Sequence, residues 1–108
     1  MTNKQRAKTK RAALRHYDKM ISWVEEQIKA DKSFEKLEPD SRYMEQHIKQ
    51  HWDAAYCSYC ITFEGCDGCL LDNPWCCGGE WQDLDNATTW KEWLYHAKQV
   101  RKYIGENG

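Results

Sequence analysis

The chemistry that this sequence shows most clearly is that of its six cysteines, which all lie within residues 57–77. They form two C-x-x-C pairs separated by five residues, followed by two adjacent cysteines: Cys57, Cys60, Cys66, Cys69, Cys76 and Cys77. A C-x-x-C turn points two thiolates to the same side, and two such turns can complete a tetrahedron around a zinc ion. The spacing therefore predicts zinc as the cofactor, held by four thiolates.

Which four residues bind the ion is left open by the spacing. The gap between the two pairs is short for a four-cysteine site, so Cys76 or Cys77 can replace one of the first four ligands. Adjacent residues project in different directions, so one of these two is expected to be free or to pack as a small apolar side chain. A single site is favoured over two, because two sites would need about eight ligands.

Histidines offer further ligands. His47 and His51 are four residues apart in a predicted helix, a spacing that places them on one face and that zinc ligands use. A solvated helical pair is the simpler interpretation, and we rank both below the cysteines as ligands. The cysteine spacings fit neither common ferredoxin pattern, and disulfides would replace the metal only in an oxidising compartment.

A site of four thiolates is closed and serves folding, whereas catalytic zinc keeps an open position beside a general base. His96 is the only histidine after Cys60, so a paired-histidine nuclease motif is missing. Four acidic residues of the same region lack the calcium-loop pattern and are interpreted as solvated turns: Asp67, Asp72, Asp83 and Asp85. We therefore expect a structural metal, coupled to folding, and no enzyme activity.

Three helices are predicted to position the cysteine segment. The first has an apolar stripe at Leu14, Tyr17, Ile21, Val24 and Ile28. The second begins near Pro39, with Asp40 or Ser41 as its cap, and runs through Met44, Ile48, Trp52 and Ala55 to the first cysteine. The third begins at a capping box of Thr89 and Glu92, has an apolar face of Trp90, Trp93, Leu94, Ala97, Val100 and Ile104, and stops at Gly105.

The length of 108 residues fits a single domain. The predicted fold class is mainly α: a small three-helix unit with a metal-stapled, Cys-rich irregular segment, residues 57–84, between helices two and three. Residues 1–12 are basic and lack an apolar stripe, so they are predicted to form a flexible arm. No apolar run is long enough to span a bilayer, and no apolar stretch follows the basic start, so we expect no membrane association and a cytoplasmic location.

Charge separates two classes of function. Residues 1–19 carry a net charge of +6, whereas residues 50–90 contain seven Asp or Glu and no Lys or Arg. Four thiolates and one zinc ion add a formal charge of about −2, so the cysteine segment should repel phosphate. Nucleic-acid binding is the alternative function, weak and nonspecific, through basic residues of the arm: Lys4, Arg6, Lys8, Lys10 and Arg11.

Protein binding fits the cysteine segment better. Aromatic side chains lie there among loops and carboxylates, and aromatic anchors ringed by polar groups are typical of protein-binding hot spots. Trp75 and Trp81 are the leading candidates to contact a protein partner. The helical unit could also form a homodimer.

The segment further resembles a group of small cysteine-rich proteins of unknown function encoded by phages and prophages. The resemblance covers about residues 44–104 and rests on the following motifs: "HW" at 51–52, "CSYC" at 57–60, "CDGCLL" at 66–71 and "CCGGEW" at 76–81. That group usually has Pro after the second C-x-x-C, where this chain has Leu70, and often a single cysteine in the third element. The resemblance implies a phage accessory protein in the host cytoplasm that binds a host or phage protein, and it implies no activity.

Overall fold

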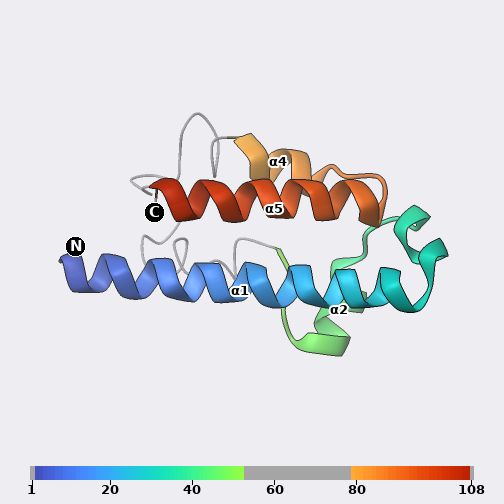
Figure 1. Cartoon of the computed structure of the whole chain (residues 1–108), viewed down its shortest axis with the longest axis horizontal. Coiled ribbons are helices and arrows are strands. Elements are labelled where there is room, and N and C mark those ends of the chain that lie inside the picture. Colours follow the sequence, from blue (N-terminus) through green and yellow to red (C-terminus); the bar gives the residue numbers. More distant parts are fainter. Residues whose placement is uncertain (1, 53–78, 108) are drawn as a thin grey trace.

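The computed structural model describes residues 2–52 and 79–107 and is built from helices (Figure 1). Its elements are α1 (Asn3–Ala30), the 3-10 helix η1 (Lys32–Lys36), α2 (Ser41–Ile48), α4 (Glu80–Asp85) and α5 (Trp90–Asn107). These residues contain no strand, which confirms the mainly α class. The six cysteines and Trp75 lie outside the described residues, so the predicted ligands and residues 57–78 of the irregular segment cannot be compared with the structure. The end of that segment is helical, because α4 covers Glu80–Asp85, so the described residues contain a fourth α-helix beyond the three predicted.

The two long helices, α1 and α5, lie side by side and antiparallel, with α4 beside α5 (Figure 1). The predicted stripe of α1 is confirmed at Tyr17, Ile21 and Val24, which are buried. The predicted face of α5 is confirmed as well, because five of its residues are buried: Trp90, Trp93, Ala97, Val100 and Ile104. Full burial of a large apolar side chain contributes about 1.5–3 kcal/mol, so this seam is the main source of stability in the described fold.

Helix α1 is longer than predicted. Thr2 and Gln5 form a capping box, in which the Gln5 amide donates to the Thr2 hydroxyl at 3.1 Å and the Thr2 amide donates to the Gln5 side chain at 3.0 Å. These bonds satisfy two backbone groups that a helix start leaves unpaired. The basic residues therefore belong to the first turns of α1, so the helix begins well before its apolar stripe.

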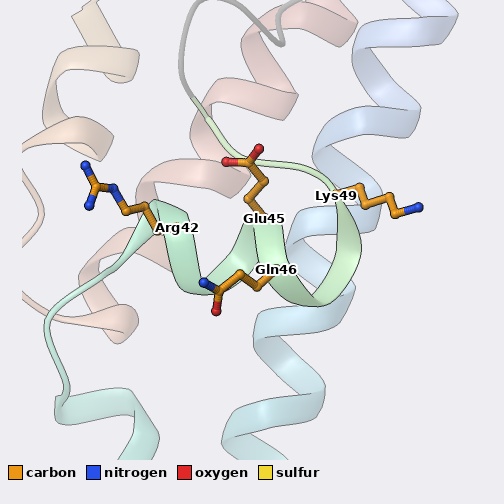
Figure 2. A pocket seen from close by; sticks show the side chains of 4 residues that line it. All are labelled: Arg42, Glu45, Gln46 and Lys49. Atoms are coloured by element: carbon orange, nitrogen blue, oxygen red, sulfur yellow. The ribbon is translucent and has the colours of Figure 1, made fainter.

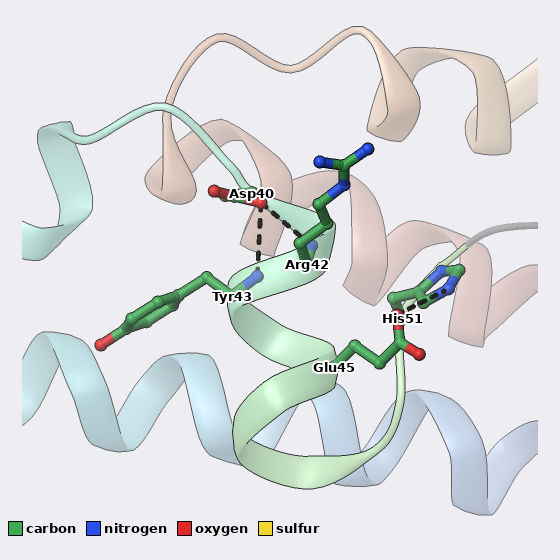
Figure 3. A network of polar contacts seen from close by, with 5 residues as sticks. All are labelled: Asp40, Arg42, Tyr43, Glu45 and His51. Atoms are coloured by element: carbon green, nitrogen blue, oxygen red, sulfur yellow. Dashed lines mark hydrogen bonds and ion pairs between the residues drawn. The ribbon is translucent and has the colours of Figure 1, made fainter.

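Helix α2 is shorter than predicted. Asp40 caps it as expected, and its carboxylate accepts the amides of Arg42 and Tyr43 (Figure 3). The helix ends at Ile48, and Lys49 adopts a left-handed conformation with φ 56°. The prediction that this helix reaches the first cysteine is wrong, because Trp52 enters the core from the chain beyond α2.

Two details of α5 also differ from the prediction. Thr89 does cap the helix, since its hydroxyl accepts the Glu92 amide at 3.2 Å, but the Glu92 carboxylate turns to the amide and hydroxyl of Thr88. The helix does not stop at Gly105 but continues to Asn107. At its start, the Trp90 amide donates to the Leu37 carbonyl at 2.9 Å and ties α5 to the end of η1.

Aromatic rings fill the core where α1 ends and α5 begins. Phe34 of η1 stacks on Trp90 with ring centroids 5.1 Å apart, and Trp23 of α1 meets Trp90 edge-on at 5.9 Å. Such pairs add about 0.5–1.5 kcal/mol beyond burial. None of the described helices combines the length and the apolar character that crossing a bilayer requires.

Candidate functional site

Two tryptophans join the chain on either side of the six cysteines, and from here on the cysteine segment means the residues between them, 53–80. The Trp81 indole N–H donates to the Trp52 carbonyl at 2.7 Å, and the Trp52 indole N–H donates to the Asp85 carboxylate at 3.2 Å. Residue 52 is the last described position before the cysteines, and Gly79 is the first after them. We call Trp52, Trp81 and Asp85 the tryptophan clamp, because they hold both ends of the segment at one place.

The clamp rests on the start of α5. The buried Trp52 ring lies 5.2 Å from Trp93 and 6.0 Å from Trp90, measured between ring centroids. Trp81 is partly buried and packs against the same core. The clamp is therefore continuous with the aromatic core, because the described residues on either side of the cysteines both pack against it.

These contacts bear on Trp81 as a predicted partner anchor. Its indole N–H is already used by the Trp52 carbonyl, and its ring is partly covered by the core. The geometry gives Trp81 a structural contact, while its partner-binding role stays a prediction.

The two histidines considered as zinc ligands do not share a helix face, because α2 ends before His51. His47 is exposed, and its Nδ1 lies 2.8 Å from the Tyr43 carbonyl. His51 is buried, with its Nε2 3.6 Å from a Glu45 carboxylate oxygen (Figure 3). In the part of the chain that the structure describes, neither histidine joins a group of three or more potential metal ligands.

A third histidine, His16, was not singled out by the sequence pattern. It is buried on α1, and its Nδ1 lies 2.6 Å from the Gln50 side-chain oxygen. Burial lowers the pKa of His16, the hydrogen bond to Gln50 opposes this shift, and the nearby His51 lowers the pKa further. His16 is therefore neutral near pH 7 and links α1 to the residues that lead into the cysteine segment.

A second group of polar side chains lies between α4 and α5. Glu80 and Asp83 are three residues apart on α4, and His96 faces them from α5. One possible ligand atom from each residue lies within 4.8 Å of those from the other two. From the sequence, Asp83 is interpreted as part of a solvated turn and no ligand role is assigned to His96, because the short helix α4 is not predicted.

Surface hollows adjoin α2 in the described residues, and two of them differ in the side chains that line them. The side chains that line the first, Arg42, Glu45, Gln46 and Lys49, point away from one another, so they form no converging site (Figure 2). The second is a groove of about 470 Å³ beside η1, with an aromatic wall of Phe34, Tyr43 and Trp90 and with Leu37, 55% exposed, at its rim. Three carboxylates also line it: Asp31, Glu38 and Asp40.

The predicted phosphate contacts all lie on the first turns of α1. Lys4, Lys8 and Arg11 are exposed and follow the i, i+4, i+7 spacing of one helix face. Arg6 is exposed on another face, and Lys10 is partly buried.

Comparisons of the chain with protein-family models, with curated proteins and with solved structures found no match.

Proposed function

We propose that this chain is a small zinc-binding protein-interaction module in which the cysteine segment holds one zinc ion and displays a surface to a protein partner. The doubled C-x-x-C supplies the ligand chemistry, and the observation that best supports the proposal is the tryptophan clamp. The Trp81 to Trp52 bond of 2.7 Å fixes the two ends of the segment that carries all six cysteines.

The clamp matters because bringing thiolates together costs conformational entropy. A loop whose ends are already joined has fewer conformations than an open chain of equal length, so less entropy is lost when four thiolates converge on one ion. The metal would in turn make the loop rigid, and rigid side chains lose less entropy when they bind a partner.

For the partner surface we propose the groove beside η1 together with the aromatic residues of the cysteine segment, Trp75 first among them. Leu37 and Tyr43 are two of the exposed large apolar side chains in the described residues, and both line this groove. The neighbouring carboxylates favour a partner segment that places an apolar side chain beside Lys or Arg. A phage accessory protein that binds a host or phage protein would use such a surface.

Metal analysis combined with thiol counting tests the first half of the proposal. Protein purified without added metal should contain about one zinc per chain, and Cys57→Ser or Cys60→Ser should each release it and lower stability. A metal-free protein with three disulfides would refute the zinc site.

Partner capture from the native cell tests the second half. Leu37→Asp should abolish capture of a specific protein, because it places a charge on the apolar rim, while zinc content and helicity stay unchanged. Tyr95→Asp is the matched control, since Tyr95 is 61% exposed on α5 and does not line the groove. Equal capture by wild type and Leu37→Asp would exclude the groove as the partner surface.

Nucleic-acid binding is the second candidate, and the basic face of α1 favours it. Lys4, Lys8 and Arg11 project from one side of a capped helix, where they can contact successive phosphates. The triple variant Lys4→Gln, Lys8→Gln and Arg11→Gln should lose any binding to duplex DNA, and the wild-type affinity should fall steeply with salt. Tight binding that survives the triple variant would contradict this mode.

A further inference from the structure

We propose that Glu80, Asp83 and His96 form a second metal site, one that takes a divalent transition ion and is chemically distinct from the thiolates. This inference goes beyond the proposed function, because none of the three residues belongs to the cysteine motif. It rests on the convergence of two carboxylates and one imidazole from α4 and α5, with ligand atoms within 4.8 Å of one another.

The spacing of the ligand atoms fits a metal ion. Ligands about 2.1 Å from a tetrahedral ion are about 3.4 Å apart. The Glu80 Oε2 to His96 Nδ1 distance is 3.5 Å, so this pair already has the separation that an ion between them would require. Asp83 is exposed, lies one turn from Glu80 on the same face of α4, and has a possible ligand atom within 4.8 Å of those of the other two residues.

The imidazole nitrogen provides a second reason. His96 Nδ1 is buried from solvent and makes no hydrogen bond among the described residues, and its 3.5 Å contact with Glu80 Oε2 is the ion-pair contact already described. Leaving a buried polar atom without a partner costs about 1–3 kcal/mol, and such an atom in a native fold calls for an explanation. A metal ion bound by the Nδ1 lone pair would satisfy it.

The surroundings hold the ligands in place and leave a path for the ion. Tyr95 meets the His96 ring edge-on, with ring centroids 5.2 Å apart. The carboxylates lie on the outer side, where Asp83 is exposed and the Glu80 side chain is 36% exposed. Two carboxylates and a neutral imidazole carry a formal charge of −2, which a divalent ion neutralises. Water would complete its coordination.

The ligand types indicate which ions the site would prefer. Imidazole suits zinc and other transition ions, while carboxylates suit manganese and magnesium, so a mixed set accepts zinc, cobalt or manganese. Manganese is the best probe, because thiolates select zinc and manganese should not displace it from the cysteines.

The experiment uses the full-length protein with its own zinc content measured first. Manganese is then titrated while the ring signals of the four histidines are followed by nuclear magnetic resonance. We expect His96 to broaden at manganese concentrations that leave His16, His47 and His51 sharp. Glu80→Gln and Asp83→Asn should each raise the required concentration about tenfold or more, as loss of a ligand or its support does at other metal sites.

Glu106→Gln is the matched control, since it removes one carboxylate from the exposed surface of α5 about 15 Å along the helix from His96. It should leave the titration unchanged. Absence of selective broadening, or broadening that persists in both ligand variants, would overturn the second site. Zinc that is lost in Cys57→Ser but kept in Glu80→Gln reports the thiolate site alone, so the failure of one proposal can be told from the failure of the other.

Discussion

Replacing Trp81 by Phe removes the hydrogen bond that joins the two ends of the cysteine segment and keeps an aromatic ring in place. The indole N–H donates to the Trp52 carbonyl at 2.7 Å, and a neutral hydrogen bond of this kind contributes about 0.5–1.5 kcal/mol net. Loss of the larger ring adds about 0.5 kcal/mol, because Trp81 is only partly buried. Trp81→Phe should therefore lower the free energy of unfolding by about 1–2 kcal/mol.

Two assays measure this change. Denaturant unfolding should show a lower midpoint with an unchanged slope, because the surface exposed on unfolding is nearly the same. The thermal midpoint should fall by roughly 5–10 °C for a domain of this size. If the clamp restrains a zinc-binding loop, transfer of zinc to a chelator should also become faster. When the full loss of about 1–2 kcal/mol favours opening of the loop, the rate should rise by about 5–30-fold.

Tyr95→Phe is the matched control. Tyr95 is 61% exposed, and Phe keeps its ring beside His96, so its stability should stay within about 0.5 kcal/mol of wild type. If Trp81→Phe is equally neutral in stability, the clamp does not support the fold. If stability falls but zinc release keeps its wild-type rate, the clamp is part of the core and does not restrain the metal loop.

Three further predictions concern other parts of the chain. Stability should decrease as pH falls below about 6.5, because unfolded His16 gains a proton at its ordinary pKa of 6.5 whereas burial lowers the pKa of the folded residue. His16→Gln should lose less stability at acid pH, so the unfolding free energies of the two proteins, measured with denaturant, should differ in their dependence on pH. The same pH dependence in both proteins would contradict the role given to His16. Val100→Ala should lower the free energy of unfolding by about 2–4 kcal/mol, because Val100 is fully buried in the seam between α1 and α5. Lys102→Ala, on the exposed side of α5, is the control and should lower it by less than about 0.5 kcal/mol. Arg101→Ala should cost at most about 1 kcal/mol, since its ion pair with Asp18 is exposed, and a larger loss in a double-mutant cycle with Asp18→Ala would show an ion pair of unusual strength.

The long amphipathic helices were predictable because burial repeats at helical spacing. Tyr17, Ile21 and Val24 mark α1, and Trp93 and Val100 mark α5, and all five are buried. Apolar residues that recur at helical spacing can be predicted to be buried from the sequence alone.

The ends of the helices were harder to predict. The basic start of α1 has no apolar stripe, yet Lys, Arg, Ala and Gln favour helices, and Thr2 and Gln5 stand at the spacing of a capping box. In α2 the error was the reverse, because Met44, Ile48 and Trp52 continue the helical period although Trp52 reaches the core from beyond the helix end. Periodicity alone cannot distinguish a helical residue from a nearby loop residue that fills the same core.

The candidate sites depend on contacts between distant residues, which leave little trace in one sequence. Trp81 donates to a backbone carbonyl 29 residues away, and any residue type at position 52 has such a carbonyl. Helix α4 has only six residues, of which Leu84 is buried, so it is too short to show a period. Without α4, nothing in the sequence places Glu80 and Asp83 beside His96.

If the cysteine segment binds zinc as proposed, the position of the clamp determines how metal binding and folding are coupled. In the described residues, the clamp meets the core at Trp90 and Trp93, near the start of α5, whereas Ile104 and the Asp18–Arg101 pair lie further along the seam toward the N-terminus of α1 (Figure 1). Substitutions at the aromatic end should therefore affect both the helical core and the cysteine segment. The Trp52 ring packs on the core, and the Trp52 carbonyl accepts the Trp81 bond that closes the cysteine segment. Changes at Ile104 should weaken helix packing and reach the metal segment only through global unfolding. Under the proposed function, a core with this division could keep α1 and α5 paired while the cysteine segment exchanges its zinc ion, which is the behaviour expected of a partner-binding loop on a stable helical support.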